Sequence, residues 1–409
     1  MAGRTSARGA VEFNLESAWC ESSTTYGSRL AVLGEIDASG LTQAKDDPER
    51  AVQYMQEGTM PIRGVKGGSF TTDIWIPGHG SATDSGTPTA EEHETILGYV
   101  LGNTTAGGAA TTASAGTTTI TTAAASGLTA GQIFWGGVKA DGRMDGQAGV
   151  VSTHSSNTLT SLVAMPAAAS GTDAIASAVM AYFTETPSSA SVPSVRQRAL
   201  TADQQYAMRG MFAQSIAISG LNPQEKPRAS ITWGVSDWDP VSATFPSSTS
   251  VDSFNPAPTA GGSLFVQNRG TATRQTYTCR SFEVSIDLGI QPVMGPGGVG
   301  SNQVIVGAVR GPARITATFV VDSESATASP TWPGRWDSDS QFYHLLFNAN
   351  GAASGKRVAL YMPNCCIIDR KPVQIAQNGI NRESITMQAY MGTDTTSELT
   401  RSAFRIGLG

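Results

Sequence analysis

Two short stretches of this chain have residue types at spacings that resemble ligand-binding or metal-binding motifs. Residues 295–300, Gly-Pro-Gly-Gly-Val-Gly, match the glycine pattern G-x-G-x-x-G of a dinucleotide-binding turn. That turn must open a helix whose N-terminus holds a pyrophosphate, but residues 303–309 are mostly apolar and β-branched. Residues 91–94, Glu-Glu-His-Glu, superficially resemble a metalloprotease helix, yet no second His follows to complete the ligand pair. The sequence predicts a loop tip at the first stretch and no metal site at the second.

The histidines and cysteines do not form a catalytic or metal-binding pattern either. His344 stands among apolar neighbours, which indicates a hydrogen-bonded structural side chain; the other histidines, in unrelated contexts, are His79, His93 and His154. The cysteines include no C-x-x-C pair and are predicted to be reduced structural thiols; they are Cys20, Cys279, Cys365 and Cys366. We therefore expect no metal, no cofactor and no enzymatic activity.

The more informative polar residues lie on predicted strands. In residues 282–288, apolar side chains alternate with Glu283, Ser285 and Asp287, as on a half-buried strand. If strands from several subunits close into a channel, the polar face can line water, and an acidic lining would repel DNA phosphates. The alternative is that these polar faces simply lie on the outer surface of the protein, exposed to solvent. The candidate lumen-facing residues are Thr71, Asp73, Glu283, Ser285, Asp287, Thr316, Thr318, Thr386 and Gln388.

A repeated order of elements positions these strands. The later copy has an alternating strand at 311–322, a short helix at 341–348 with apolar residues at i, i+3 and i+4, a hairpin-like run at 357–369 and a last strand at 383–391. The earlier copy has a strand at 63–76, a helix at 94–101, a hairpin partner at 206–219 and a closing strand at 229–238. The order and spacing, rather than residue identity, predict two copies of one fold.

The gap after the first helix is much longer than the gap after the second. About ninety extra residues are enough for a small domain. Within them, short strands follow one another at intervals of about ten residues, which favours a small β-barrel or sandwich. The domains predicted are 1–104 with 191–245, an insert at 105–190, and 246–409.

Composition narrows the class of protein further. At 409 residues the chain exceeds what one core usually supports. Charged residues are 15%, which suits turn-rich β domains rather than long charged helices. The formal net charge of −6 argues against a general electrostatic surface for nucleic acid. The sequence has no signal-peptide pattern and no apolar run long enough for a membrane span.

The order of strand, short helix, hairpin and strand resembles the tail tube (major tail) proteins of tailed bacteriophages. The resemblance rests on residues 63–70 with the helix 96–102, and on residues 208–220 running into 226–238. Residues 117–175 are similar to the small β-domains often inserted in such proteins. The resemblance implies a mainly β fold class: a duplicated tail-tube-type β-sandwich or barrel with a short flanking helix in each copy, plus an inserted small β-barrel domain.

The resemblance also implies a function. Members of that family pack into rings that stack into a hollow tube for DNA, and a ring presents six copies of the fold. A chain with two copies then implies trimeric, pseudo-hexameric rings in the virion, assembled in the host cytoplasm. The implied partners are the tape measure, tail terminator and distal tail proteins, and DNA passes through the lumen without specific binding. The alternative from another class is a surface adhesin or carbohydrate-binding β-protein, with the insert as its binding module.

Overall fold

The computed structural model describes most of the chain. The residues described are 10–21, 26, 28–30, 32, 37–44, 65–76, 92–122, 127–136, 147–163, 174–177, 179–184, 194–200, 205–222, 225–241, 262–269, 274–295, 305–322, 342–349, 357–373, 382–392 and 397–409. All statements below concern these residues.

The chain is mainly β, as the sequence predicts. Residues up to 241 form β1 (Ala10–Leu15), β2 (Ser28–Leu30), β3 (Leu41–Ala44), β4 (Val65–Trp75), α1 (Glu92–Leu101), β5 (Gly102–Thr105), β6 (Gly108–Ala115), β7 (Thr119–Thr122), β8 (Ile133–Gly136), β9 (Ala148–Ser155), β10 (Thr158–Ser161), β11 (Ala174–Ser177), β12 (Met180–Phe183), β13 (Val195–Leu200), β14 (Gln205–Ser219), β15 (Arg228–Val235) and β16 (Asp237–Val241). The remainder forms β17 (Gly262–Asn268), β18 (Arg274–Asp287), β19 (Ile290–Met294), β20 (Ile305–Arg310), β21 (Arg314–Asp322), β22 (Tyr343–Ala349), β23 (Val358–Val373), β24 (Arg382–Ala389), α2 (Glu398–Arg401) and β25 (Arg405–Leu408).

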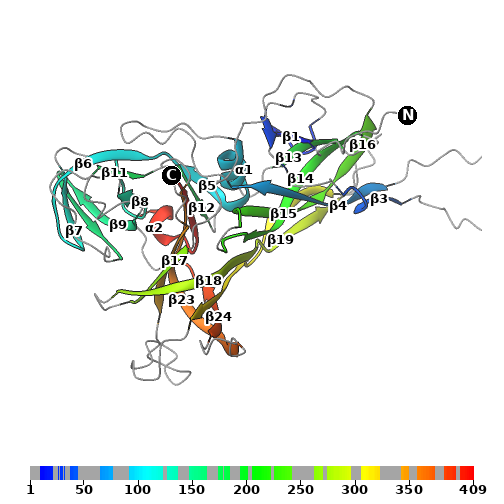
Figure 1. The fold of residues 1–409 in the computed structure, drawn as a ribbon. Coiled ribbons are helices and arrows are strands. Elements are labelled where there is room, and N and C mark those ends of the chain that lie inside the picture. Colours follow the sequence, from blue (N-terminus) through cyan, green and yellow to red (C-terminus); the bar gives the residue numbers. More distant parts are fainter. Residues whose placement is uncertain are drawn as a thin grey trace, which may run out of the picture.

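These strands divide into a large sheet system and a small barrel (Figure 1). The barrel closes in the order β10-β7-β6-β11-β8-β9, and the hairpin β19–β20 forms a separate two-stranded sheet. All other strands belong to the large sheet system, and the C-terminus lies between it and the barrel.

Eight antiparallel strands of the large system follow one another in the order β3-β4-β15-β14-β18-β21-β24-β23. We call them the eight-strand sheet. One face is apolar because alternate residues such as Ile74, Ile231, Ile216, Ile286 and Ile385 are buried in the main core. The longer of the two described helices, α1, packs its buried residues Ile96, Leu97 and Val100 into the same core.

The N-terminal halves of the two longest strands, β14 and β23, extend beyond the eight-strand sheet. There β14 pairs with β13 and β16, while β23 pairs with β22 and β25. β1 then pairs with β13 and β2, and β17 pairs with β22 and β18. The main core is therefore enclosed by the eight-strand sheet and by these outer strands.

The predicted helix at 341–348 is wrong. Residues 343–349 form the strand β22, and all seven are buried. Each face of β22 packs in a different apolar cluster: Leu345 and Phe347 lie in one, and Leu346 lies in the other. The strand therefore lacks the alternation of apolar and polar residues that marks a half-buried strand. The fold class therefore needs a correction: a flanking helix follows β4 as predicted, at Glu92–Leu101, but no helix occupies 342–349 in the second half.

The barrel enters and leaves the large sheet system through two paired strands. β5 precedes it and β12 follows it, and these pair with each other so that Thr105 lies opposite Met180. β12 also pairs with the C-terminal strand β25. Residues 180–183, which the sequence analysis assigned to the insert, thus belong to the large sheet system.

Candidate functional site

The nine polar residues predicted from strand alternation share one face of the eight-strand sheet. Their strand neighbours, such as Phe70, Val284 and Phe319, are buried on the opposite face. Six of the nine are exposed and three, Thr316, Thr386 and Gln388, are partly exposed. By strand, the nine are Thr71 and Asp73 on β4, Glu283, Ser285 and Asp287 on β18, Thr316 and Thr318 on β21, and Thr386 and Gln388 on β24.

This polar face continues without a break from the first half of the chain into the second. One row of directly opposed residues crosses six strands: Asp73, Ser230, Ala217, Ser285, Thr316 and Gln388. Hydroxyl groups bridge neighbouring strands, since Thr318 Oγ1 lies 3.1 Å from Thr386 Oγ1 and Thr316 Oγ1 donates to the carbonyl of Ser285 at 3.4 Å. The two halves of the chain meet where β14 and β18 pair as regular antiparallel strands.

The charge of the polar face is mixed, which differs from the acidic lining expected from the sequence. Arg314 lies directly opposite Asp287, and Arg228 is exposed on β15. Asp322 accepts hydrogen bonds from Arg280 and Arg382, and the bond from Arg280 is the main cause that lowers the Asp322 pKa. Alternation identified the acids, but their basic neighbours come from strands whose register the sequence does not display.

Asp73 and Glu283 stand apart from this pairing. Neither forms an ion pair with any residue that the structure describes, and both are exposed. They are therefore the positions where a change of charge would most directly alter the potential of the face.

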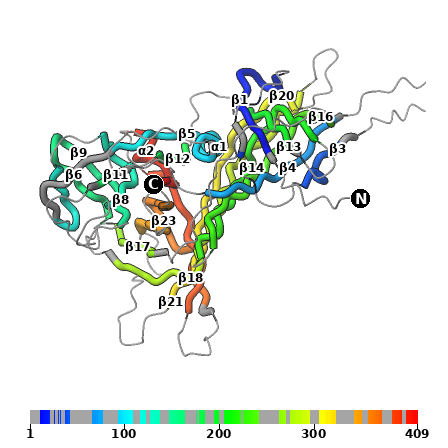
Figure 2. Tube along the Cα trace, turned by 45° about the horizontal axis from the view of Figure 1, so that its top comes forward, coloured from blue at the N-terminus to red at the C-terminus, as the bar shows by residue number. Residues whose placement is uncertain are grey.

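The polar face ends in two strand edges that pair with no other described strand. β3 pairs through one edge with β4, and β23 pairs over residues 365–373 with β24 alone, apart from the contact of Cys365 with β22. Figure 2 shows β14, β18 and β21 as a narrow band, with the barrel to its left. The eight-strand sheet is thus open at both ends.

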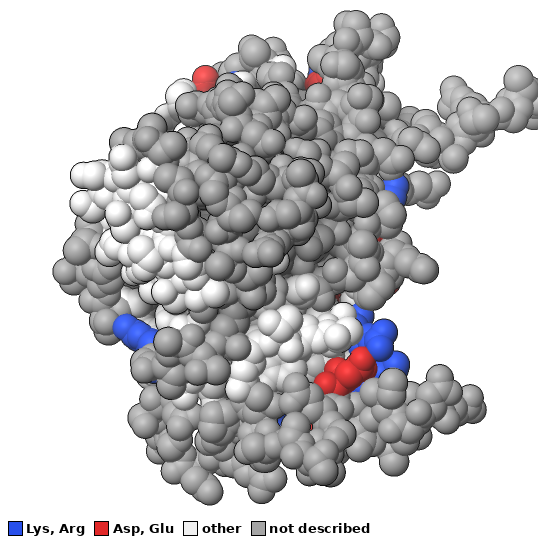
Figure 3. Space-filling view, turned by 60° about the vertical axis from the view of Figure 1, so that its left-hand side comes forward, with Lys and Arg blue, Asp and Glu red and all other residues white. Residues whose placement is uncertain are grey.

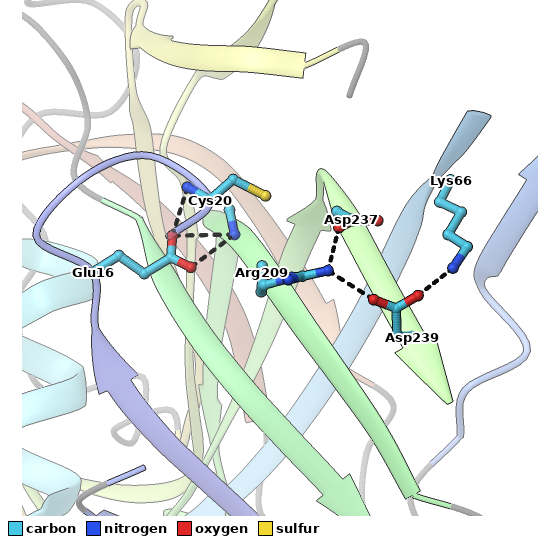
Figure 4. A network of polar contacts seen from close by, with 7 residues as sticks. Glu16, Cys20, Lys66, Arg209, Asp237 and Asp239 are labelled. Carbon is cyan, nitrogen blue, oxygen red and sulfur yellow. Dashed lines mark hydrogen bonds and ion pairs between the residues drawn. The ribbon is translucent and has the colours of Figure 1, made fainter. Parts of the chain in front are cut away.

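A charged cluster near the other end of β14 holds strands together (Figure 4). Arg209 Nη2 donates to Asp237 Oδ2 at 2.6 Å and to Asp239 Oδ2 at 2.7 Å. Lys66 of β4 pairs with Asp239 as well. These contacts link β14, β16 and β4, so the cluster stabilises the sheet and leaves none of its charges without an opposite partner.

Glu16, in the same view, is a buried carboxyl at the end of β1. It accepts hydrogen bonds from the backbone N–H groups of Cys20 and Gly210, both at 3.1 Å, and from the hydroxyl of Ser194. Desolvation by burial is the largest influence and raises the Glu16 pKa. Gly210 has φ 58, a conformation that glycine adopts at little cost, so Glu16 fixes an irregular point in β14.

Among the described residues, His344 and three of the four cysteines are buried. The four cysteines are free, and burial raises the pKa of the Cys20 thiol to about 12. His344 is buried, and desolvation lowers its pKa to about 4. Its Nδ1 lies 2.9 Å from the hydroxyl of Tyr361, whose pKa is raised by burial, so the tyrosine donates to a neutral imidazole. His79 and Glu91 lie outside the described residues.

The part of the barrel that the structure describes carries no charged side chain. None of its described residues is Asp, Glu, Lys or Arg, and Figure 3 shows a broad area of uncharged side chains over this side of the molecule. Phe134 and Trp135, the aromatic residues in its described part, are buried. An exposed aromatic platform of the kind that binds sugars is therefore not present on that part of the barrel.

Trp135 docks the barrel against the outer strands of the second half. It packs in one cluster with Leu346, Ala359 and Tyr361, and its Nε1 donates to Asn348 Oδ1 at 3.3 Å. A Cβ added at Gly407 would lie 2.8 Å from the indole, so a larger residue there would displace Trp135. The barrel and the second half thus share a well-packed interface.

A short sequence match links the two predicted copies of the fold. Residues 228–232 read Arg-Ala-Ser-Ile-Thr and residues 382–386 read Arg-Glu-Ser-Ile-Thr, and these segments lie in β15 and β24. An alignment on this pentapeptide places β15 and β24 at corresponding positions.

No protein-family model and no curated protein matches this chain. Among the helices that the structure describes, none is long and apolar enough to cross a membrane.

Proposed function

We propose that this protein is a virion structural subunit that assembles into stacked rings and forms the hollow tail tube through which phage DNA passes. The observation that carries the proposal is the uninterrupted polar face of the eight-strand sheet, which spans both halves and ends in two open edges. A sheet of this kind can close with copies of itself into a water-filled barrel whose lining is polar.

Two copies of one fold support this function. In the first half the first strand pairs with the last, and the last pairs with the middle one, in the order β4-β15-β14; the second half repeats this as β21-β24-β23. When Arg228-x-Ser-Ile-Thr is aligned with Arg382-x-Ser-Ile-Thr, the β-bulge between Ala213 and Ser215 coincides with the bulge between Ile367 and Asp369. Bulges are specific features of a strand pair, so their coincidence favours duplication over chance.

The outer strands extend the same correspondence. β13 pairs with β14 through a bulge at Val195 and Gln197, and β22 pairs with β23 through a bulge at Tyr343 and Leu345. The residues opposite these bulges correspond under the same alignment. Strand β22 is thus the counterpart of β13, and the barrel together with α1 lies in the connection between β4 and β13.

With two copies per chain, three chains supply the six copies of a pseudo-hexameric ring. The polar faces, including Thr71, Asp73, Glu283 and Ser285, line the channel, and DNA passes without specific binding. The tape measure, tail terminator and distal tail proteins are the partners of such a tube. The subunit assembles in the host cytoplasm and resides in the virion.

Electron microscopy of the purified full-length protein tests this function. Rings or tubes are expected, with three chains per ring and two similar densities per chain around the channel. A protein that remains monomeric at every concentration and salt condition, or that forms rings of six chains, would overturn the proposal. Mass photometry of the same sample gives the number of chains independently.

A further inference from the structure

Inside the chain, β14 pairs with β18 where the two halves of the eight-strand sheet meet. There, Ser215 lies opposite Asp287, Ile216 opposite Ile286, and Ala217 opposite Ser285. Under the alignment of the two halves, β14 corresponds to β23 and the last part of β18 corresponds to β3. These counterparts, β23 and β3, are the two open edges of the eight-strand sheet.

The register of this second junction follows from pairings within the chain. Ser215 and Asp369 correspond because they lie opposite Thr232 and Thr386, the threonines that end the shared pentapeptide. Asp287 and Thr42 correspond because Asp287 lies opposite Arg314 and Thr42 lies opposite Gly67, which occupy the same position on β21 and β4.

We propose that residues 369–371 of β23 form the docking edge for residues 40–42 of a second copy of this chain, antiparallel, with Asp369 opposite Thr42 and Lys371 opposite Gly40. This inference rests on the proposed function for its biological meaning, but the contact can be measured without it. Backbone hydrogen bonds of the added strand provide the affinity, as in other cases of strand addition.

The strands β14 and β23 differ in composition, and the composition of β23 suits an edge that stays exposed until a second chain pairs with it. In β14 the paired positions Ile216 and Ile218 are fully buried apolar residues. In β23 the same positions hold Arg370, whose Nε donates to Glu383 Oε2 at 2.9 Å, and Pro372, which has no N–H. Lysine, proline and charges on the core-facing side are the devices by which open edges avoid indiscriminate pairing.

Disulfide cross-linking tests the register. The variant carries Thr42→Cys and Asp369→Cys in a Cys366→Ser background, because Cys366 lies on the same strand. Directly opposed residues have Cβ atoms about 5 Å apart, whereas the two ends of one eight-strand sheet are on the order of 30 Å apart, so only a link between chains can form. Mild oxidation is expected to give dimers and trimers on a non-reducing gel.

The matched control replaces Asp369→Cys by Arg370→Cys, which points to the opposite face of β23. We expect at least about tenfold less cross-linking for this control. Equal linking of the two variants, or no linking of the first, overturns the proposed register. Rings in which the cysteines at positions 42 and 369 stay unlinked would overturn this junction and leave the proposed tube function standing. Linked chains that form no rings would support the junction and overturn the proposed tube function.

A second variant tests the composition of the β23 edge. It replaces Arg370, Lys371, Pro372 and Glu383 by Ile, Ala, Ile and Ala, the residues at the corresponding positions of β14 and β15. Self-association is expected at about a tenfold lower protein concentration than in the parent, measured by sedimentation velocity. The control, Ser384→Ala with Gln388→Ala on the neighbouring strand, should associate like the parent. An unchanged association of the four-residue variant would show that the edge composition does not control pairing.

Discussion

If the polar face lines the proposed channel, replacing two of its acids by lysine should make the assembled tubes hold DNA. Asp73 and Glu283 suit this change because both are exposed and neither pairs with a described cation. Asp287 is less suitable, because Arg314 lies directly opposite it and a lysine would place like charges across the strand pair. The fold should persist in the variant Asp73→Lys with Glu283→Lys, since the buried face of each strand is untouched.

The expected magnitude follows from counterion release. A ring of three chains would carry about six added lysines, and if about three of them reach phosphates, the slope of log K against log salt changes by about −2.7. Affinity for double-stranded DNA would then fall about 40-fold between 50 and 200 mM salt, where the parent tubes bind negligibly. The assay is co-sedimentation of preformed tubes with short labelled DNA over this salt range.

The control carries the same change of charge at exposed positions outside the polar face, Glu225→Lys with Glu398→Lys. If both variants assemble and retain equal amounts of DNA at low salt, Asp73 and Glu283 do not face the lumen. An assembled Asp73/Glu283 variant that retains no DNA at all would refute the argument as well.

Three more outcomes are expected, two for the barrel and one for the protonation of His344. Deleting residues 106–179 and joining Thr105 to Met180 by an Asn-Gly turn should leave rings visible by negative-stain microscopy, because those two residues are direct strand partners; loss of rings from a folded variant would contradict this. Trp135→Ala should lower the free energy of unfolding by about 3–5 kcal/mol in urea titrations and expose the barrel to protease, since the indole is buried; a loss below about 1 kcal/mol would show that the interface is not tightly packed. The His344 pKa is depressed to about 4 by burial, so the unfolded chain binds its proton first. Stability should therefore fall between about pH 6.5 and 4, by on the order of 3 kcal/mol, and His344→Gln should remove most of that fall; an identical pH profile would refute it.

Period-two alternation predicted the strands that face solvent on one side. Residues 282–287 and 314–322 are clear examples, and both lie in strands of the eight-strand sheet. Their neighbours in the sheet could not be predicted, because pairing is set by contacts between distant segments and alternation carries no information about partners. The mixed charge of the polar face, with Arg314 opposite Asp287, follows from that missing information.

Two elements escaped prediction for local reasons. The sequence of β22 resembles a helix because both of its faces are apolar, and on the second face Leu346 packs in a cluster that includes barrel residues such as Trp135. β6 lies in a tract of Gly, Ala, Thr and Ser whose composition gives no alternation of apolar and polar residues, yet it pairs with β7 and β11 to close the barrel. In each case the deciding contact is with a segment far away in the sequence.

The position of the barrel bears on the proposed duplication. It arises in the first half, between β4 and β13, but it packs on β22, β23 and β25 of the second half. Under the proposed duplication, the corresponding connection in the second half is the stretch between β21 and β22, which spans only residues 323–342. A ring of six single-fold chains would carry either six barrels or none. In the proposed ring of three chains, each barrel would be held by contacts within its own chain, so three protrusions should alternate with three bare positions around the outside. A reconstruction with six equivalent protrusions would contradict this arrangement, whereas three at every second position would tie the barrel to the duplication.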